Sequence, residues 1–445
     1  MPAAVTTKNE RCFAGRNPVT RSTLYVSGTL GDPMHLLKEA RALTSEQRRA
    51  FLAAFFGWML DGYDFTILTF VLIDIQRTFT VNATLAGALG TVTLMFRLIG
   101  GAAAGTAADR WGRKPPLILS ILWFSLFSVL SGLSTSYAML FGCRALFGIG
   151  MGGEWAAGMP LALEHLPDRL RGTAAGLLQG AWAWGYILSA LAFQFIYPRL
   201  AAHGELAWRI MFWTGAMPAL LVLWVRLRVR ESPVWLSRQQ TTEPTRAGAS
   251  LRRIFHRDLI GTTLQCSLLA AAFMVSYYSV TFWYATFLRG RSLNTLPYLV
   301  ALNAGGIFGA AFWGWASEGR LGRRGAVTVA ALLGVSMAPM YLLAVDTRVL
   351  LAGALLVGFG AHGMWGAFPS YLTERFPSAV RGAGAGFCYH AGALAGSFAS
   401  YVIGHMHDSG MTLAHAMVLA IIVSGFAAGL LVWLGPETRG RSLAT

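Results

Sequence analysis

The fold is decided by the stretch GTAADRWGRK, residues 105–114, because the chain contains it twice. A diverged copy, GWASEGRLGRR, fills residues 314–324, and the two glycine–arginine pairs lie 210 residues apart. A second motif, Glu-x2-Pro-x3-Arg-Gly, starts at Glu164 and again at Glu374, at the same offset. A constant offset in two separate motifs indicates an internal duplication that gives two similar halves.

Apolar runs of about 20 residues recur through the chain, each long enough to cross a bilayer of about 30 Å. Only 13% of the residues are charged, whereas soluble proteins carry about 25%. We expect an all-α polytopic membrane protein, with twelve transmembrane helices in two pseudo-symmetric six-helix bundles. The runs lie near 51–73, 85–107, 115–134, 137–161, 173–197, 209–227, 260–285, 296–317, 326–344, 349–371, 383–404 and 413–434.

A polar, arginine-rich stretch between the sixth and seventh runs divides the spans six and six. It suits a solvated linker held near anionic lipid. The expected domains are a largely disordered cytoplasmic tail over 1–49, bundles over 50–227 and 259–434, a cytoplasmic linker over 228–258 and a cytoplasmic tail over 435–445.

The net charge of +16 first suggests a nucleic-acid partner. The basic residues, however, gather in short loops on one side of the spans, as the positive-inside rule describes. We therefore expect a monomer in the inner (plasma) membrane, with both termini cytoplasmic, a lipid bilayer around it and no nucleic acid bound. These loops are DRWGRK (109–114), DRLR (168–171), GRLGRR (319–324) and PETRGR (436–441).

Enzyme and metal signatures are absent from the sequence. No HExxH or GxSxG motif occurs, and no CxxC or other ligand spacing joins the four cysteines. We expect no enzyme, no cofactor and no metal site.

The duplicated loops are expected to gate the transport path. Arginines there can pair with carboxylates, and an acidic side chain suits the positive N-terminus of a neighbouring helix. We expect contacts between the halves that hold one conformation closed on the cytoplasmic side, since parallel repeats alternate access by rocking. The expected gating residues are Asp109, Arg110, Gly112, Arg113, Lys114, Arg144, Glu164, Arg171, Glu318, Arg323, Arg324, Glu374 and Arg381.

Charged residues within the spans are expected to have a structural or functional role, because placing each in the bilayer centre costs about 2.5–3.5 kcal/mol. Asp61 and Asp64 lie three residues apart, on one helix face. Two adjacent carboxylates in a low dielectric disfavour double ionisation, which suits a reversible proton site. A structural hydrogen-bonding pair is the alternative.

Arg97 precedes Gly101 and Gly105 on a close-packing stripe, so it faces protein or a cavity. Its guanidinium matches a substrate carboxylate, and an internal ion pair with Asp61 or Asp64 is the alternative. Glu154 also faces inward, and we expect it to accept a proton or to pair with Arg144.

Further polar residues are expected to line the cavity or to act as hydrogen-bonding groups. His362 and His390 could titrate near neutral pH or serve only as hydrogen-bonding groups. The expected substrate-binding residues besides Arg97 are Gln179, Tyr186, Asn303, Tyr389 and His390, and Trp182 and Trp184 are expected beside them.

Two stretches resemble the major facilitator superfamily: GTAADRWGRK, and CRALFGIG over 143–150. Within it, LDGYDFTILTFVL (60–72), MFRLIGG (95–101), GIGMGGEWAAG (148–158) and FCYHAGALAGSFAS (387–400) are similar to the sialate/lactate proton symporter group. Aromatic-acid proton symporters share the DGYD element. RESPVWL (230–236) and PETRGRSL (436–443) occur more widely, including in sugar porters.

The resemblance implies proton-coupled symport of a small organic carboxylate anion by alternating access. Sialic acid permeases of this type carry two extra spans where this chain has a linker, which favours a smaller acid such as lactate or pyruvate. The alternatives are an aromatic-acid or sialate proton symporter, or a drug or metabolite proton antiporter.

Overall fold

The computed structural model describes residues 43–439, apart from 167, 234, 237–248 and 378–379. Two compact units divide the chain, Met1–Thr44 and Ser45–Thr445, and the described helices belong to the second. Most of the tail expected over 1–49 lies outside the described residues. The first described helix begins at Ser45, before the predicted end of that tail.

The N-terminal half forms six helical rods, and the sixth of them is broken. Their elements are α2 (Ser45–Phe79), α3 (Ala83–Trp111), α4 (Lys114–Gly132), α5 (Tyr137–His165), α6 (Asp168–Phe195), and then α8 (Leu206–Trp213), η2 (Thr214–Ala216) and α9 (Met217–Arg228). The short α7 (Tyr197–Leu200) and η1 (Ala201–His203) follow α6.

The C-terminal half repeats this arrangement after the short α11 (Ala249–Ile254). Its elements are α12 (Ile260–Thr281) with α13 (Tyr284–Gly290), α14 (Thr295–Glu318), α15 (Gly322–Leu342), α16 (Thr347–Val357) with η3 (Gly358–His362), η4 (Gly363–Gly366) and α17 (Phe368–Glu374), α18 (Arg381–Asp408), and α19 (Leu413–Leu431) with η5 (Val432–Leu434). The predicted all-α architecture of six rods in each half is confirmed.

Eight of the described helices are long and apolar enough to cross a membrane. The other four rods, formed by α5, by α6, by α8 with α9, and by α18, are not among these eight. Charged residues such as Arg144 and Glu154 in α5 lower the apolar signal of a span without preventing it from lying in a bundle.

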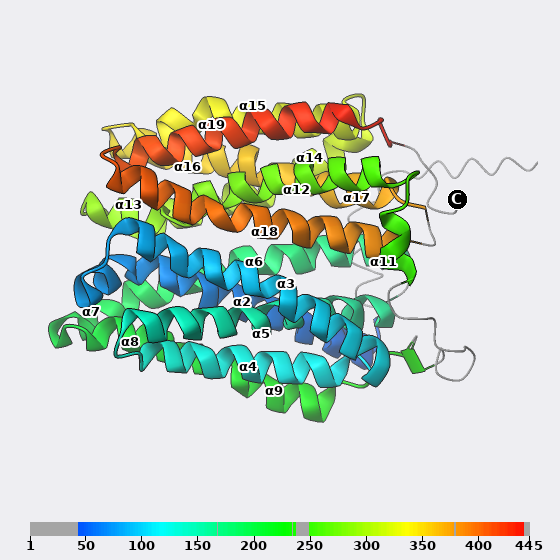
Figure 1. The fold of residues 1–445 in the computed structure, drawn as a ribbon, viewed down its shortest axis with the longest axis horizontal. Helices are drawn as coiled ribbons and strands as arrows, with labels where there is room; N and C mark the ends of the chain where they lie inside the picture. The colour runs from blue at the N-terminus through cyan, green and yellow to red at the C-terminus, as the bar shows by residue number, and fades with distance from the viewer. Residues whose placement is uncertain (1–42, 167, 234, 237–248, 378–379, 440–445) are drawn as a thin grey trace, which may run out of the picture. The chain divides into compact units, whose positions relative to one another are not determined.

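The rods have two distinct ends (Figure 1). The helices α11 and α17 lie at one end, and α7 and α13 lie at the other. We call the first the arginine-rich end, because the loops at 109–114 and 319–324 lie there, and the second the opposite end. Five of the six rods that begin at the opposite end have a side chain capping their first turn; these caps are Asn82, Ser136, Asn294, Asp346 and Thr412. The other rod, which begins with α8 after Glu205, has no side-chain cap.

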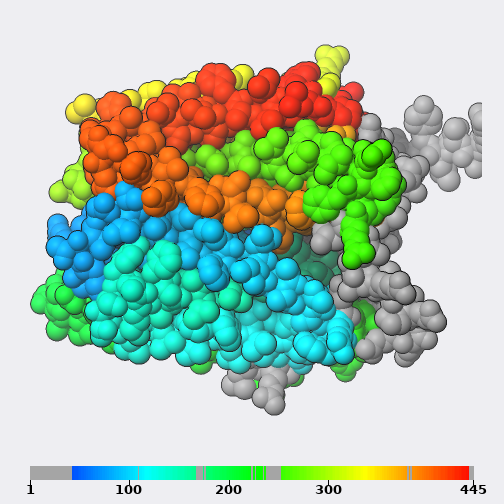
Figure 2. Space-filling view, viewed as in Figure 1, coloured from blue at the N-terminus to red at the C-terminus, as the bar shows by residue number. Residues whose placement is uncertain are grey.

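The two halves meet along α3 and α18, which lie side by side (Figure 2). Glycine permits the close approach: a Cβ added to Gly87 would collide with the backbone of Ser400. At the opposite end, Asp408 accepts hydrogen bonds from the backbone N–H groups of Ala83 (3.1 Å) and Thr84 (2.7 Å). This carboxylate therefore ties the end of α18 to the start of α3.

The C-terminal half contains two broken rods. The first breaks between α12 and α13, at Phe282 and Trp283. The other passes through a π-helical turn, η3, and a 3₁₀ turn, η4, which contain His362 and Trp365. Such turns inside a helix often mark functional positions.

Candidate functional site

The duplicated loops form the same ion pair in each half. Arg113 donates from Nε and Nη2 to Glu164, at 3.4 and 3.2 Å. Arg323 donates from the same two atoms to Glu374, at 3.2 and 2.9 Å. Paired guanidinium and carboxylate groups of this fork geometry make strong, directional contacts. The sequence repeat is therefore a structural repeat.

A second pair of carboxylates completes each network, and sequence reasoning did not identify it. Glu231 accepts from the backbone N–H groups of Arg113 and Lys114, at 2.8 and 3.1 Å. Glu437 does the same for Arg323 and Arg324, at 2.9 and 3.1 Å. Each glutamate thus caps the N-terminus of a helix, α4 or α15.

The hydroxyl that follows each capping glutamate also joins the network. Ser232 Oγ donates to Glu164, and Thr438 Oγ1 donates to Glu374 at 2.6 Å. The motifs RESP and PETR are therefore structural counterparts. Ser232 and Thr438 lie 206 residues apart rather than 210, so the constant offset did not reveal this match.

The described hydrogen bonds and ion pairs of these gating residues join groups within one half. Glu318 accepts from Arg323 at 2.6 Å, and Arg324 Nη1 donates to the carbonyl of Gly435 at 3.2 Å. The expectation that the loops bond the two halves together therefore stays a prediction. The exposed Arg110 lies near the Trp111 ring, and the side chains of Asp109, Arg171 and Arg381 lie outside the described part.

The halves are instead bonded at the opposite end. Tyr186 donates to the carbonyl of Thr281 at 2.8 Å, and Thr286 donates to the carbonyl of Thr69 at 3.1 Å. These hydrogen bonds join α6 and α2 of one half to α12 and α13 of the other. The path through the molecule is therefore closed at the opposite end.

Five charged side chains are buried inside the N-terminal half. Each is at most 2% exposed, and they are Asp61, Asp64, Arg97, Arg144 and Glu154. Within the described part of the chain, both oxygens of Asp61 and the Nε and Nη2 atoms of Arg97 have no hydrogen-bond partner. Arg97 is thus not bonded to Asp61 here, and its guanidinium remains available to a ligand.

Arg97 lies against two indole rings. Its guanidinium carbon is 4.9 Å from the Trp58 ring centroid and 5.7 Å from that of Trp182. The two rings are themselves 4.9 Å apart. Cation–π contacts hold a guanidinium while leaving its N–H edge unused. The arrangement orients Arg97 without consuming its hydrogen-bond donors.

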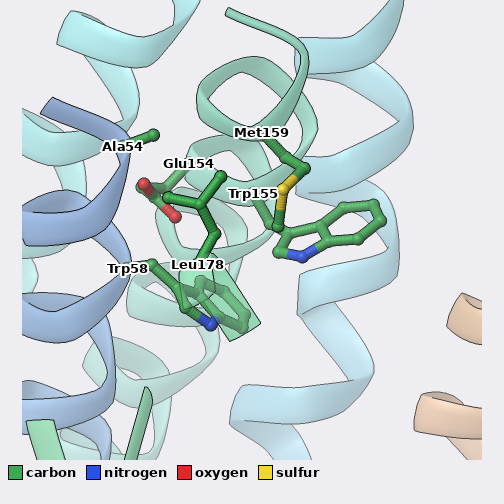
Figure 3. A pocket seen from close by; sticks show the side chains of 6 residues that line it. All are labelled: Ala54, Trp58, Glu154, Trp155, Met159 and Leu178. Carbon is green, nitrogen blue, oxygen red and sulfur yellow. The ribbon is translucent and has the colours of Figure 1, made fainter. Parts of the chain in front are cut away.

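Glu154 lines a small cavity next to this group (Figure 3). The cavity has a volume of about 10 Å³, room for roughly one water molecule, and is lined by Ala54, Trp58, Glu154, Trp155, Met159 and Leu178. Gly57 permits the approach, since a Cβ there would lie 2.5 Å from Glu154 Oε1. Space for a water molecule beside the carboxyl group suits a residue that exchanges protons.

Arg144 belongs to a separate group deeper in the half. Its guanidinium lies over the Phe147 ring at 4.0 Å, and Asp64 accepts from Ser128 at 3.5 Å nearby. Ten residues separate Arg144 from Glu154 on α5, which is about 15 Å of helix. The expected Glu154–Arg144 pair is therefore wrong, as is the gating position of Arg144.

The remaining predicted residues fall into different environments. Tyr389 stacks on Trp155, with centroids 5.2 Å apart and planes 3° apart, and His390 lies edge-on to Trp155 at 5.3 Å. Gln179 Oε1 has no partner among the described residues, and Asn303 donates to the Leu299 carbonyl of its own helix.

Trp184 is an exception among the residues expected to line the cavity. Its side chain is 53% exposed, and Leu177, two turns away on the same face of α6, is 58% exposed. Trp184 therefore lies on the outer surface of the bundle, and the expectation is wrong. Aromatic residues occur both on the outer surface of a membrane bundle and in a cavity lining, so the residue type alone did not distinguish these two positions.

Comparison with known proteins identifies the family. The model of the Major Facilitator Superfamily matches residues 54–400. The chain belongs to the major facilitator superfamily. This protein is therefore a multi-pass membrane transporter and not an enzyme.

This chain is 34% identical to the probable 4-methylmuconolactone transporter of Cupriavidus pinatubonensis, over 91% of this chain and 94% of that transporter. It is 28% identical to the sialic acid transporter of Escherichia coli (89% and 95% covered) and 29% identical to the cis,cis-muconate transport protein of Acinetobacter baylyi (85% and 91%). Its fold matches the inward open xylose transporter of E. coli, with a TM-score of 0.73, 21% identity and 88% and 97% covered.

Proposed function

We propose that this transporter carries a small organic carboxylate together with a proton, and that Arg97 binds the carboxylate. The observation that supports the proposal is the state of Arg97. It is 2% exposed, is oriented by Trp58 and Trp182, and has unused donors within the described structure. A buried guanidinium with unpaired donors is costly, and an anionic ligand would offset that cost.

The proton has three candidate carriers, Asp61, Asp64 and Glu154. A buried carboxylate is costly unless it is paired or neutralised by a proton. When the anion occupies Arg97, protonation of a neighbouring carboxyl keeps the net charge of the site constant. Anion and proton then cross together without moving net charge against the membrane potential.

The different contacts at the two ends of the bundle suit alternating access. We place the arginine-rich end, and with it both termini, on the cytoplasmic side of the inner membrane, in line with the positive-inside rule. The duplicated networks around Glu164 and Glu374 stiffen each half at that end, so that each half moves as a unit. The hydrogen bonds at the opposite end break when the outward-facing state forms.

The relatives support an organic acid without fixing which one. One is described as a transporter of cis,cis-muconate and another as a transporter of sialic acid. Both ligands are carboxylates. The alternative of drug or metabolite export by proton antiport predicts opposite proton movement.

Substrate-induced pH change in proteoliposomes tests this function. Adding the acid outside should make the external medium more alkaline as the proton enters with the anion. Transport without proton uptake would contradict the coupling, and acidification would indicate antiport.

The role of Arg97 is tested by Arg97→Lys, with Arg209→Lys as control. Lysine lacks the planar fork, so uptake should fall at least about tenfold, a change of 1.4 kcal/mol. Arg209 bonds the Gly132 carbonyl at the edge of the half, and its variant should transport normally. Uptake by Arg97→Lys at the wild-type rate would show that the Arg97 guanidinium does not bind the substrate.

A further inference from the structure

An unbroken series of aromatic rings runs across the interface between the two halves. Trp182 lies 5.8 Å from Phe65, and Phe65 lies 6.2 Å from Tyr278 of the other half. Tyr278 in turn contacts Tyr277 at 5.4 Å, and the Tyr277 ring lies 4.8 Å from His362. The rings therefore connect Arg97 in one half to the broken rod that contains His362 in the other.

The far end of this series has unused hydrogen-bonding groups. His362 is 7% exposed, and its Nε2 has no partner in the described part of the protein. The indole N–H of Trp365 is also buried without a partner there, and the Trp365 ring lies 6.2 Å from Tyr389. The π and 3₁₀ turns bring both residues to the same stretch of helix.

The unused groups along the rings are mostly donors. The indole N–H groups of Trp58, Trp155, Trp182 and Trp365 are buried without partners among the described residues. Trp indole is a donor only, so the partner that satisfies these groups is an acceptor. Buried polar groups left unpaired cost about 1–3 kcal/mol each, and a ligand rich in acceptors would recover part of that cost.

We infer that the substrate is a planar, unsaturated acid with two acceptor groups, its carboxylate on Arg97 and its distal acceptor on His362 and Trp365. The inference rests on the proposed function and narrows its substrate class. Aromatic faces favour flat, unsaturated molecules through stacking. A small saturated acid such as lactate offers these rings no flat, unsaturated face.

The structure holds this site in a closed state. The cavity beside Arg97 has a volume of about 10 Å³, which is too small for such an acid. Trp155 and Tyr389 come from different halves and close the ring series next to that cavity. Substrate therefore enters when the halves separate and these rings part.

Binding of four acids to the purified, full-length protein tests the inference. The probes are cis,cis-muconate, with two acceptor ends, benzoate, which is planar with one, and lactate and pyruvate. The variants are Trp365→Phe, which keeps a ring and removes the donor, and His362→Ala. Trp315→Phe, on the exposed surface, is the control for replacing an indole.

Wild-type protein should bind muconate most tightly. Loss of one buried hydrogen bond should weaken muconate binding about tenfold in Trp365→Phe and His362→Ala, while benzoate affinity changes little. His362→Gln keeps a polar group and provides a second variant if His362→Ala fails to fold. Equal losses for muconate and benzoate would overturn the role of His362 and Trp365.

The remaining outcomes separate this inference from the proposed function. Tightest binding of lactate or pyruvate would overturn the planar class and leave carboxylate transport standing. If none of the acids binds, and Arg97→Lys transports normally, the proposed function fails and the inference fails with it.

Discussion

Arg289 of the C-terminal half forms an ion pair with Asp74 of the N-terminal half, with Nη1 and Oδ2 2.8 Å apart. Tyr197 donates to the same carboxylate at 2.8 Å. Both charged side chains are only 16% exposed, so water screens the pair less than a surface pair. This contact links the halves directly at the opposite end and stabilises the state in which that end is closed.

Removal of this pair should open the opposite end. Arg289→Ala removes roughly 1 kcal/mol from the closed state, which shifts the equilibrium about fivefold toward the open state. Spin labels at positions 77 and 348, one in each half at that end, should report a longer distance. Arg291→Ala is the matched control, because the Arg291 guanidinium donates to the Ala344 carbonyl and lies over the Phe287 ring, both in its own half. An unchanged distance in Arg289→Ala would contradict this role.

Two glycines should tolerate no side chain. Gly112 and Gly322 have φ values of +96° and +67°, and an added Cβ would collide with the carboxylates of Glu231 and Glu437. Alanine at either position should destabilise the protein by about 1–2 kcal/mol from the backbone alone, with the collision adding to that. Thermal unfolding in detergent measures the change.

Gly410→Ala separates backbone strain from collision. Gly410 also has a positive φ, +101°, but no atom lies within 4 Å of its added Cβ. It should lower the melting temperature less than Gly112→Ala or Gly322→Ala does. Equal losses at all three positions would show that the collision with the glutamates contributes nothing.

The helix cap formed by Glu437 should give a pH-dependent stability. Burial acts to raise the pKa of Glu437, but backbone N–H groups that donate to its carboxylate outweigh burial and lower the pKa. Its contribution is therefore complete above the unfolded value of about 4.3 and is lost as the pH falls through the lower folded value. The donors are Arg323, Arg324, Thr438 and Arg439.

Glu437→Gln should therefore be less stable than wild type by about 1 kcal/mol at pH 7. The difference should narrow below about pH 4, where the wild-type carboxylate begins to take up its proton. Melting temperatures of both proteins between pH 7 and pH 3.5 measure it. A difference that stays constant over this range would mean that the charge of Glu437 is irrelevant.

Glu154 should carry the coupled proton, because it lines the small cavity beside Arg97. Glu154→Gln cannot exchange a proton, so proton-driven uptake should fall at least about tenfold. Exchange of labelled for unlabelled substrate needs no net proton movement and should continue. Asp61→Asn and Asp64→Asn provide the comparison, and Glu46→Gln, on the partly exposed first turn of α2, is the control. Proton-driven uptake retained in Glu154→Gln would assign the proton to an aspartate.

Much of the candidate site could be predicted from single residues. Charged residues such as Arg97 and Glu154 stand out because insertion into a membrane costs free energy, and the glycines on their helix faces indicate an inward orientation. The pairing among these residues could not be predicted. Arg144 and Glu154 share one helix, yet about 15 Å of rise separates them.

The sequence by itself determined the architecture. The length of each apolar run is fixed by the thickness of a bilayer, and the repeated loops at residues 105–114 and 314–324 show the two halves. Only the tertiary structure decided that Glu231 and Glu437 complete the two loop networks, and that Trp58 and Trp182 hold Arg97. The length of an apolar run and the recurrence of a motif can both be read directly along the chain. Contacts between distant residues depend on how the helices pack, and no local pattern encodes them.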